Sequence, residues 1–317
     1  MNEQVSASGD VKLKEESLNN LKSKNSNNVD LFGFLNIYKP KGITSHDVVS
    51  RLRRITKIRQ IGHTGTLDPF AVGVLPVCIG KSTRLIEYLK DDKEYIATVQ
   101  FGSDTDTYDL EGEVVKTYDM KISQQELLEE LKTFCGEIEQ YPPKYSAIKV
   151  NGKKLYDYAR QGLEVEIKPR KVIISKIELL EFDREGQCAK ILVACSSGTY
   201  IRSIAYDLGQ KLNCGGHLIA LERTKAGMFD VNSSVKLDDL KDFSEVENIL
   251  INPLDVMDFS KYELDENEKE KVSHGMALTN KGFKDSDIVI LIYSGRMYAI
   301  GMVKSDKIII KKVFGEA

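Results

Sequence analysis

The sequence lacks any run of about 18 apolar residues, and it therefore predicts no transmembrane helix. It also lacks a basic segment followed by an apolar one near its start, so we expect a protein that is not exported. Its five cysteines are odd in number and form no C-x-x-C pair, which fits reduced cytoplasmic thiols better than a disulfide framework. A formal net charge of -3 gives no overall attraction for an anionic partner, so any anion-binding surface must be local.

Three short patterns that often mark ligand sites are incomplete. "GKST" resembles the end of a phosphate-binding loop, but Leu75 stands where that loop needs a glycine. "SDTDTYDLEGE" has Tyr108 and Asp109 where a calcium loop wants a ligand and then a glycine, so we interpret it as a solvated turn. Cys214 and His217 have no second pair of metal ligands at finger-like spacing. We therefore expect neither a nucleoside-triphosphate site nor a metal site at these positions.

The chain does contain strand and helix patterns, mixed without a regular βαβ alternation. Alternating apolar residues predict strands at "EYIATVQFG", "KVIISKIELLEFD" and "CAKILVACSSG". Helical spacing predicts helices at "SHDVVSRLRRI" behind a Ser cap, "SQQELLEELKTFCG" with a capping box, "KLYDYARQG" and "YIRSIAYDLGQKL". We predict an α+β fold with a large, mostly antiparallel mixed sheet.

Composition divides the chain into three segments. Residues 1–30 are rich in Asn, Ser, Lys and Glu and have no aromatic residue, which predicts a disordered extension. Residues 31–258 hold the mixed strand and helix patterns and form the main predicted domain. Residues 259–317 contain "DIVILIYSGRMYAIGMVKSDKIIIKKVF", three short strands joined by tight turns, which predicts a small β-rich second domain.

One stretch, "GHTGTLDPFAVGVLPVCIGKSTRLIEYL", holds an isolated acid. Asp68 is its only carboxylate before Glu87, and an Asp that precedes Pro commonly initiates a turn. Two neighbours argue for more than a turn. His63 lies on the same Gly-rich loop, and the apolar run "FAVGVLPV" would exclude water from one side of the acid. A carboxylate in such a place is a candidate nucleophile or general base.

The segment "GHTGTLDPFAVGVLP" resembles the catalytic motif of the TruB family of tRNA pseudouridine synthases. Further segments resemble the family's other motifs in the expected order: "NIYKPKGITSHDVV", "KEYIATVQFGSDTDTYDLEGEV", "PPKYSAIKVNGKKLYDYARQG", "CSSGTYIRSIAYDLG" and "LERTKAGMF". The resemblance covers roughly residues 33–230, and several ordered motifs are far more specific than one short pattern. The tail occupies the position of the family's PUA-type RNA-binding domain.

The resemblance implies a pseudouridine synthase fold with a C-terminal PUA-like domain, and isomerisation of uridine 55 in the TΨC arm of tRNA. The N1–C1′ bond breaks, the detached uracil rotates, and C5 bonds to C1′. Neither a metal nor an organic cofactor is implied. The expected partner is tRNA, with its TΨC stem-loop at the catalytic site and its acceptor end at the tail. We expect a cytoplasmic monomer with no membrane association.

The resemblance also implies roles for individual residues. Asp68 matches the catalytic Asp, which could attack C1′, attack C6 of the base or abstract the C2′ proton; each route needs an ionised carboxylate. Arg202 matches the Arg that pairs with this Asp, although the pattern alone would make it a surface helix residue. The residues expected to bind the substrate are Tyr95, which stacks on the flipped base, Tyr200, a second active-site tyrosine, Leu221, an apolar pocket wall, and His63, which helps to displace the uridine.

Local basic runs support an RNA partner, although such runs are usually solvated faces. They are "RLRRITKIRQ", "IKPRK" and the tail lysines Lys304, Lys307, Lys311 and Lys312. Two alternatives stay open. One is a pseudouridine synthase that acts on another RNA. The other is a non-catalytic RNA-binding or tRNA-chaperone protein, which would not need Asp68.

Overall fold

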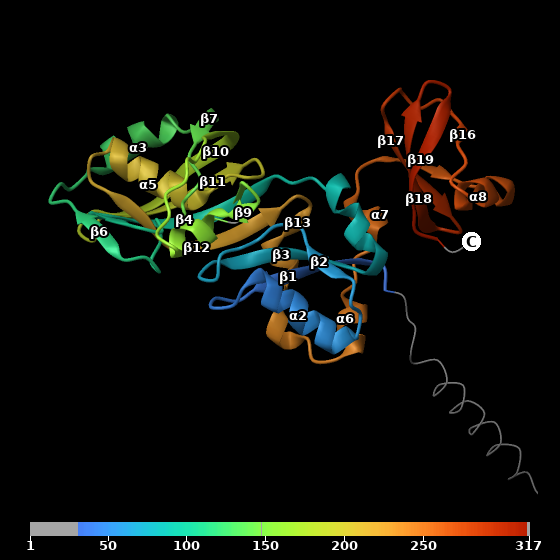
Figure 1. Cartoon of the computed structure of the whole chain (residues 1–317), viewed down its shortest axis with the longest axis horizontal. Helices are drawn as coiled ribbons and strands as arrows, with labels where there is room; N and C mark the ends of the chain where they lie inside the picture. The colour runs from blue at the N-terminus through green and yellow to red at the C-terminus, as the bar shows by residue number, and fades with distance from the viewer. Residues whose placement is uncertain (1–30, 147, 316–317) are drawn as a thin grey trace, which may run out of the picture.

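The structure is a computed structural model that describes residues 31–146 and 148–315, so the predicted extension at 1–30 lies outside the described residues. Figure 1 shows an elongated molecule in which the C-terminal strands form a separate sheet at one end. In the part of the chain that is described, no helix combines the length and the apolar character needed to cross a membrane.

A ten-stranded sheet forms the body of the molecule. Its pairings are antiparallel except for β1 with β14 and β3 with β12, which confirms the predicted α+β class with a mostly antiparallel sheet. The main path, in spatial order, is β14 (Val235–Lys236), β1 (Gly33–Lys39), β3 (Val72–Ile79), β12 (Gly216–Ala226), β4 (Lys93–Phe101), β11 (Cys188–Cys195), β10 (Arg170–Asp183) and β7 (Gly136–Gln140). The two strands off this path are β2 (Ile61–His63) on β3 and β13 (Phe229–Asp230) on β12.

In Figure 1, helices α2 and α6 lie below strands β1 and β3 of the large sheet and α3 and α5 lie above strands β4 and β12, whereas α8 lies beside the C-terminal sheet. The helices are α2 (Ser45–Thr56), α3 (Gln124–Lys132), α4 (Leu155–Arg160), α5 (Ile201–Lys211), α6 (Phe243–Asn248), α7 (Pro253–Val256) and α8 (Glu266–Ser273), with 3₁₀ helices η1 (Gly80–Tyr88), η2 (Val231–Ser233) and η3 (Leu237–Asp239). Two small hairpins are formed by β5 (Ser103–Thr105) with β6 (Val114–Thr117), and by β8 (Lys149–Val150) with β9 (Lys153–Lys154).

Helix α2 begins at Ser45, and its N-cap lies one residue before the predicted Ser cap. Thr44 is the N-cap: its hydroxyl accepts from the Asp47 amide, and the Asp47 carboxylate accepts from the Thr44 amide, which together form a capping box. The expectation of a Ser cap is therefore wrong. Threonine is also a favoured N-cap residue, and Ser45 is left free to bond elsewhere. Its hydroxyl contacts the backbone of Leu67, next to Asp68.

Strands β1 and β3 bury side chains on both faces, because a strand sends successive residues to opposite sides. Leu35 and Ile37 pack with helix α2, whereas Phe34 packs with the C-terminal part of the chain. On β4, alternate residues from Tyr95 to Phe101 are buried against α3 and α5. Both faces of the sheet therefore pack against other parts of the chain: β1 packs against α2 and the C-terminal part, and β4 packs against α3 and α5.

The C-terminal part folds into a five-stranded sheet. The three strands expected there are present as β17 (Ile288–Tyr293), β18 (Arg296–Lys304) and β19 (Lys307–Val313). They are joined by turns in which Ser294, Gly295 and Ser305 have positive φ. The remaining strands are β15 (Ser260–Glu263) and β16 (Leu278–Thr279). The domain boundaries at 258 and 259 stay a prediction.

The C-terminal sheet shares a hydrophobic core with the large sheet. Phe34 and Phe229 of the large sheet lie in one buried cluster with Ile290, Ile300 and Phe314 of the C-terminal part. Polar contacts add to this core, because Arg84 on η1 donates to the Val313 carbonyl at 2.9 Å. The two sheets are therefore packed against each other and are not joined by a linker alone.

A chain that ends at Asp258 is expected to be markedly less stable than the full chain. Each apolar side chain that passes from full burial to water loses about 1.5–3 kcal/mol, and the truncation uncovers several. Urea unfolding of both chains gives the free energies of unfolding to compare. Phe314→Ala, which weakens the contact and keeps the C-terminal sheet, should fall between them. An unchanged free energy for the truncated chain would show that the shared core contributes nothing.

Candidate active site

A cavity of about 420 Å³ lies between the 64–68 loop, strands β4 and β12, and the start of α5. This volume is within the usual range for small-ligand sites, about 300–1,000 Å³. The structure brings five of the expected site residues to its wall: Asp68, Tyr95, Tyr200, Arg202 and Leu221. His63 does not line the cavity; it ends strand β2, just before the loop. The proximity is observed, whereas the roles of all six residues stay predictions.

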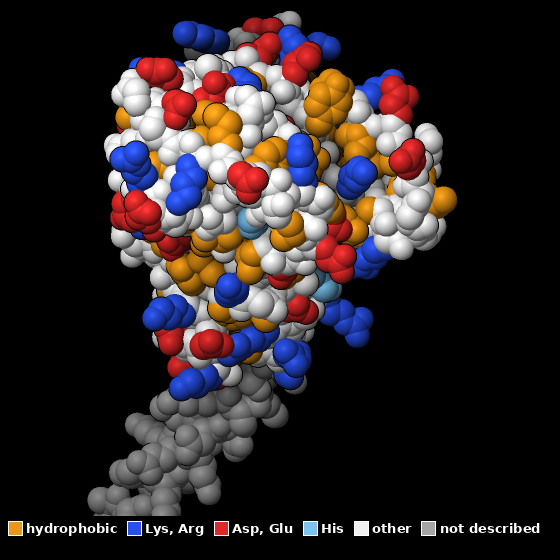
Figure 2. Space-filling view, turned by 90° about the vertical axis from the view of Figure 1, so that its left-hand side faces the viewer, with side chains coloured by type: hydrophobic (Ala, Val, Ile, Leu, Met, Phe, Trp, Pro, Cys, Tyr) orange, Lys and Arg blue, Asp and Glu red, His pale blue; other side chains and the backbone are white. Residues whose placement is uncertain are grey.

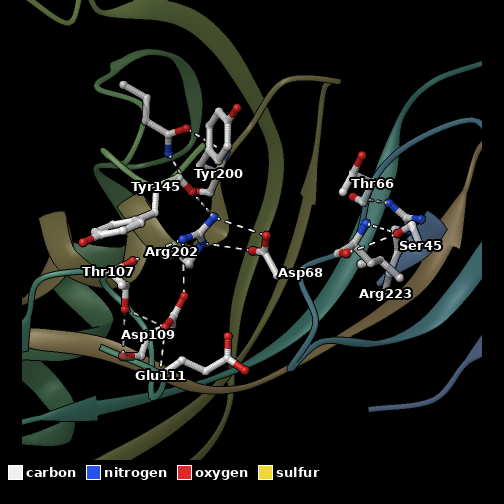
Figure 3. Close-up of polar contacts among 12 residues, drawn as sticks. Ser45, Thr66, Asp68, Thr107, Asp109, Glu111, Tyr145, Tyr200, Arg202 and Arg223 are labelled. Carbon is white, nitrogen blue, oxygen red and sulfur yellow. Dashed lines mark hydrogen bonds and ion pairs between the residues drawn. The ribbon is translucent and has the colours of Figure 1, made fainter. Parts of the chain in front are cut away.

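Asp68 and Arg202 point toward each other across the cavity (Figure 3). Arg202 Nε lies 3.0 Å from Asp68 Oδ2, and Arg202 Nη2 donates to Asp68 Oδ1 at 3.3 Å. Arg202 is buried in the first turn of α5, so it is not the surface helix residue that its pattern alone suggests. The side chain of Asp68 keeps 34% of its accessible surface. The carboxylate is therefore fixed by a cation and still reachable from the cavity.

A second carboxylate holds the other side of Arg202. Arg202 Nη1 lies 3.3 Å from Asp109 Oδ2, and Asp109 Oδ1 accepts from the Thr107 hydroxyl at 2.6 Å. Asp109 is only 3% exposed, so the interpretation of "SDTDTYDLEGE" as a solvated turn is wrong for this residue. It is also wrong for Asp104, which is buried and accepts from Tyr118. The Arg202 guanidinium can bind Asp68 and Asp109 at the same time because it has donors on several sides.

The backbone of the Asp68 loop is anchored by buried polar side chains. Ser45 Oγ donates to the Leu67 carbonyl at 3.2 Å and accepts from the Leu67 amide at 2.8 Å. Lys39 Nζ donates to the Pro69 carbonyl at 3.3 Å and to Ile43 at 2.7 Å. Lys39 is fully buried, and this burial lowers its pKa to about 8. These bonds hold the residues on both sides of Asp68.

Arg223 anchors the first half of the same loop from strand β12. Its Nε donates to the Val74 carbonyl at 2.7 Å, and its Nη2 donates to the Gly65 carbonyl at 3.1 Å. A third, longer contact of 3.5 Å joins Nη1 to the Thr66 carbonyl (Figure 3). Together with Ser45 and Lys39, this arginine fixes the loop nearly residue by residue. Such support restricts the position of the Asp68 carboxylate.

The pairing of β4 with β12 positions Tyr95 and Leu221, and the side-chain amide of Gln140 positions Tyr200. Arg223 pairs with Tyr95 and Leu221 pairs with Ala97 across β12 and β4. Because strand residues alternate, Tyr95, Leu221 and Arg223 share the face that lines the cavity. Tyr200 caps α5, and its backbone exchanges two hydrogen bonds with the Gln140 side chain. The cavity therefore has an aromatic, an apolar and a charged wall.

Burial raises the pKa of Asp68 above its ordinary value, and the nearby negative charge of Asp109 adds to the rise. The Arg202 guanidinium opposes this effect and lowers the pKa. Burial likewise lowers the pKa of His63, so this imidazole favours its neutral form. The cavity thus holds a carboxylate that is more basic than a solvated one and is kept charged by an adjacent cation.

Catalysis that needs the Asp68 carboxylate is expected to fall as the pH is lowered. The midpoint should lie above the ordinary Asp pKa of 3.8, because the folded protein raises this pKa. The pH dependence of kcat/KM measures the pKa in the free enzyme. Asp109→Asn removes a negative charge near Asp68, which lowers its pKa, so the acid limb should move to lower pH. A shift to higher pH in this variant would contradict the proposed coupling.

Sequence reasoning missed several residues that line the cavity. Lys93, Tyr145 and Arg223 all contribute to its wall, and the Tyr145 carbonyl also accepts from Arg202 at 3.1 Å. Each lies inside a quoted motif, so position in the motif was the available signal. Burial was not readable from the motif, because lysine and arginine are rarely buried without a partner.

The described residues include no group of three or more His, Cys, Asp or Glu side chains placed to hold a metal ion. All five cysteines are free thiols. Figure 2 shows one end of the molecule, where positive and negative side chains are interspersed and hydrophobic side chains gather near the centre. This view has no face of a single charge, so attraction of an anion depends on local features.

Two family models match consecutive parts of the chain. The N-terminal domain of the TruB family of pseudouridylate synthases matches residues 53–201. The C-terminal domain of tRNA pseudouridylate synthase B matches residues 202–257. The chain is 42% identical over 303 residues to a tRNA pseudouridine synthase B of Francisella philomiragia, covering 92% of this chain and 97% of that protein. A protein of the same name from Caldanaerobacter subterraneus is 43% identical over 286 residues, covering 89% and 99%.

Solved structures give a similar result. An H/ACA ribonucleoprotein bound to a substrate RNA containing 2′-deoxyuridine has a TM-score of 0.66 and 26% identity, covering 90% of this chain and 86% of that chain. An archaeal box H/ACA ribonucleoprotein complex has a TM-score of 0.65 and 27% identity, with the same coverage of 90% and 86%.

Proposed function

Because the chain belongs to the TruB family of pseudouridylate synthases, we propose that it isomerises uridine 55 in the TΨC arm of tRNA to pseudouridine. It is a tRNA pseudouridine synthase and thus an isomerase. The observation that carries the finer proposal is the Asp68 carboxylate, held by Arg202 on the wall of a cavity that has aromatic and apolar sides.

The target uridine must leave its stack before it can enter this cavity, which costs a few kcal/mol. Aromatic side chains receive extruded bases well, and Tyr95 presents its ring from the cavity wall. Leu221 supplies an apolar surface beside it, and Tyr200 lies at the start of α5. These residues are placed to hold a flat base near Asp68.

Asp68 then activates the nucleotide. It attacks C1′, attacks C6 of the base, or removes the C2′ proton, and each route begins from the carboxylate. Arg202 keeps the carboxylate ionised and oriented. In the whole reaction the N1–C1′ bond breaks, the C5–C1′ bond forms, C5 loses a proton and N1 gains one. The RNA keeps its composition, so no second substrate is consumed.

The remaining features of the proposal concern partners and location. The TΨC stem-loop occupies the cavity, and the lysines of the C-terminal sheet contact the acceptor end of the tRNA. The protein acts as a monomer in the cytoplasm, where its free cysteines stay reduced. The molecular mass of the purified chain, measured by sedimentation at micromolar concentration, tests whether the protein is a monomer.

Mapping of pseudouridine in tRNA after incubation with the purified protein tests the function. Pseudouridine at position 55 supports the proposal, and pseudouridine only elsewhere supports a synthase with another RNA target. A protein that binds tRNA and forms no pseudouridine would instead be a non-catalytic RNA-binding or chaperone protein. An Asp68→Asn sample made in parallel excludes contaminating activity.

A further inference from the structure

Arg223 carries a buried positive charge that no acid neutralises among the residues the structure describes. It is 1% exposed; three of its hydrogen bonds go to backbone carbonyls, and a further one joins it to the Tyr95 side chain. A guanidinium carries a full positive charge and five N–H donors, and none of these partners carries a full negative charge. Burial of a charge without an opposite charge is costly, and proteins rarely keep one without a use.

Lys93 brings a second cation to the same corner of the cavity. It lies two residues before Tyr95 on β4, so its side chain projects from the same face of the strand. Both Lys93 and Arg223 line the cavity. Between them lies Gly65: a Cβ there would stand 3.4 Å from Lys93 Cε and 3.6 Å from Arg223 Nη1. Since glycine has no side chain, the space between the two cations stays open.

Asp91 and Asp92 lie close enough to raise the pKa of Lys93, whereas three other nearby acids are engaged elsewhere. Asp68 is bound to Arg202 on the other side of the cavity. Glu222 accepts from the Tyr38 hydroxyl at 3.0 Å, and Glu94 accepts from the Thr224 hydroxyl at 2.8 Å. Lys93 Nζ donates to a backbone carbonyl, that of Asp91. The corner thus holds two cations whose bonds in the described chain include no carboxylate.

The electrostatics agree with this geometry. Burial lowers the pKa of Lys93, and the charge of Arg223 lowers it further. Arg223 likewise lowers the pKa of His63 after burial, whereas at Lys39 its effect is smaller than the opposite effect of Asp68. The positive charge of Arg223 therefore disfavours the charged forms of Lys93 and His63. An anion that entered the corner would relieve this repulsion.

We propose that Lys93, Arg223 and Gly65 form an anion-binding corner for one of the two phosphates that flank the flipped uridine. Lys93 contacts the phosphate, Gly65 leaves room for it, and Arg223 supplies charge from beneath the cavity wall. The proposal rests on the proposed function, because it takes an RNA nucleotide as the occupant. With Asp68 on the opposite side, the nucleotide is held both at its backbone and at its reacting sugar.

Neutral backbone linkages test the corner. TΨC stem-loops are made with a methylphosphonate on the 5′ or the 3′ side of the target uridine. Their dissociation constants are measured with the full-length chain carrying Asp68→Asn, so that no turnover occurs. We expect one of the two linkages to weaken binding about ten-fold, as for a lost charge-assisted hydrogen bond. Adding Lys93→Gln should weaken binding of the native RNA by a similar factor and abolish sensitivity to that linkage.

The salt dependence gives a second readout. Lys93→Gln should reduce the slope of log K against log salt by about 0.7, the value for one phosphate contact on a single strand. Lys132→Gln, at an exposed position on α3, is the matched control and should stay as sensitive to the linkage as its parent. Lys93 is chosen over Arg223 because Arg223 also anchors the Asp68 loop, and its loss could disturb folding.

Two results would overturn the corner: insensitivity of the parent chain to both linkages, or undiminished sensitivity after Lys93→Gln. The proposed function is judged separately, by conversion of the native stem-loop with the chain that retains Asp68. Failure of that conversion would contradict the proposed function, whatever the binding data show. Conversion without linkage sensitivity would contradict the corner alone.

Discussion

Replacement of Asp68 by Asn is expected to abolish pseudouridine formation while the fold and tRNA binding are kept. The amide has nearly the shape of the carboxylate, but it can neither act as a nucleophile nor remove a proton at neutral pH. All three chemical routes open to Asp68 begin from its negative charge. Pseudouridine content of tRNA after long incubation is the measurement, and turnover by a pure variant would refute the catalytic role.

The same substitution makes a separate statement about stability. The folded protein raises the pKa of Asp68, so between the unfolded and folded pKa values the folded state binds more protons. Stability from this group is therefore lost as the pH rises through that window, and at neutral pH the ionised Asp68 is a cost. We expect Asp68→Asn to melt at the same temperature as the parent or higher. A lower melting temperature would mean that the ion pair with Arg202 outweighs burial.

Replacement of Arg202 by Met is expected to cost both activity and stability. Arg202 contacts two carboxylates, and the side chain of Asp109 keeps only 5% of its accessible surface. Removal of one partner leaves this charge buried and uncompensated, which typically costs about 3–5 kcal/mol. Activity should be lost as well, because Asp68 loses the cation that keeps it ionised. Urea unfolding and pseudouridine mapping give the two readouts.

Two further variants separate these effects. The double variant with Arg202→Met and Asp109→Asn removes the orphaned charge, so it should recover much of the stability and none of the activity. Arg202→Lys keeps the charge, but one ammonium cannot bridge two carboxylates as a planar guanidinium does. A displaced reacting group can lower the rate by about 100-fold, so we expect a folded and slow enzyme. Full activity of Arg202→Lys would show that its charge alone matters.

The sequence predicted much of the fold because most of its strands and helices have clear periodicity. The strand at "EYIATVQFG" alternates polar and apolar residues and is found as β4, and the C-terminal strands were equally distinct. Strand β12 was not predicted, although it supplies Leu221 and Arg223 to the cavity. Its segment, "GHLIALERTKA", has charged residues among apolar ones and two register shifts with β4, so its alternation is broken.

The Asp68–Arg202 pair could be expected only from the family resemblance, because 134 residues separate the two positions. Asp109 was misinterpreted for a related reason. A run of Asp and Thr residues is typical of a solvated turn, but Asp109 contacts Arg202 of α5 and pairs with Leu218 of β12, which are distant in sequence. Lys39 is also buried, and its ammonium donates to the Pro69 carbonyl beside Asp68, 30 residues away in the sequence. Long-range packing decides such cases, and local patterns do not record it.

Strand β1 sets the distance between the C-terminal sheet and the Asp68 loop. Its seven residues span about 20 Å at the usual rise of about 3.4 Å per residue. Near one end, Phe34 packs into the core shared with the C-terminal sheet. At the other end, Lys39 donates a hydrogen bond to the Pro69 carbonyl, next to Asp68. The Asp68 loop and the C-terminal sheet are therefore held apart by a paired strand and not by a hinge. On the proposed tRNA assignment, the enzyme measures the spacing between the TΨC loop and the acceptor end. A tRNA with two base pairs inserted between them should lose the benefit of the C-terminal contact and be converted no faster than the isolated stem-loop.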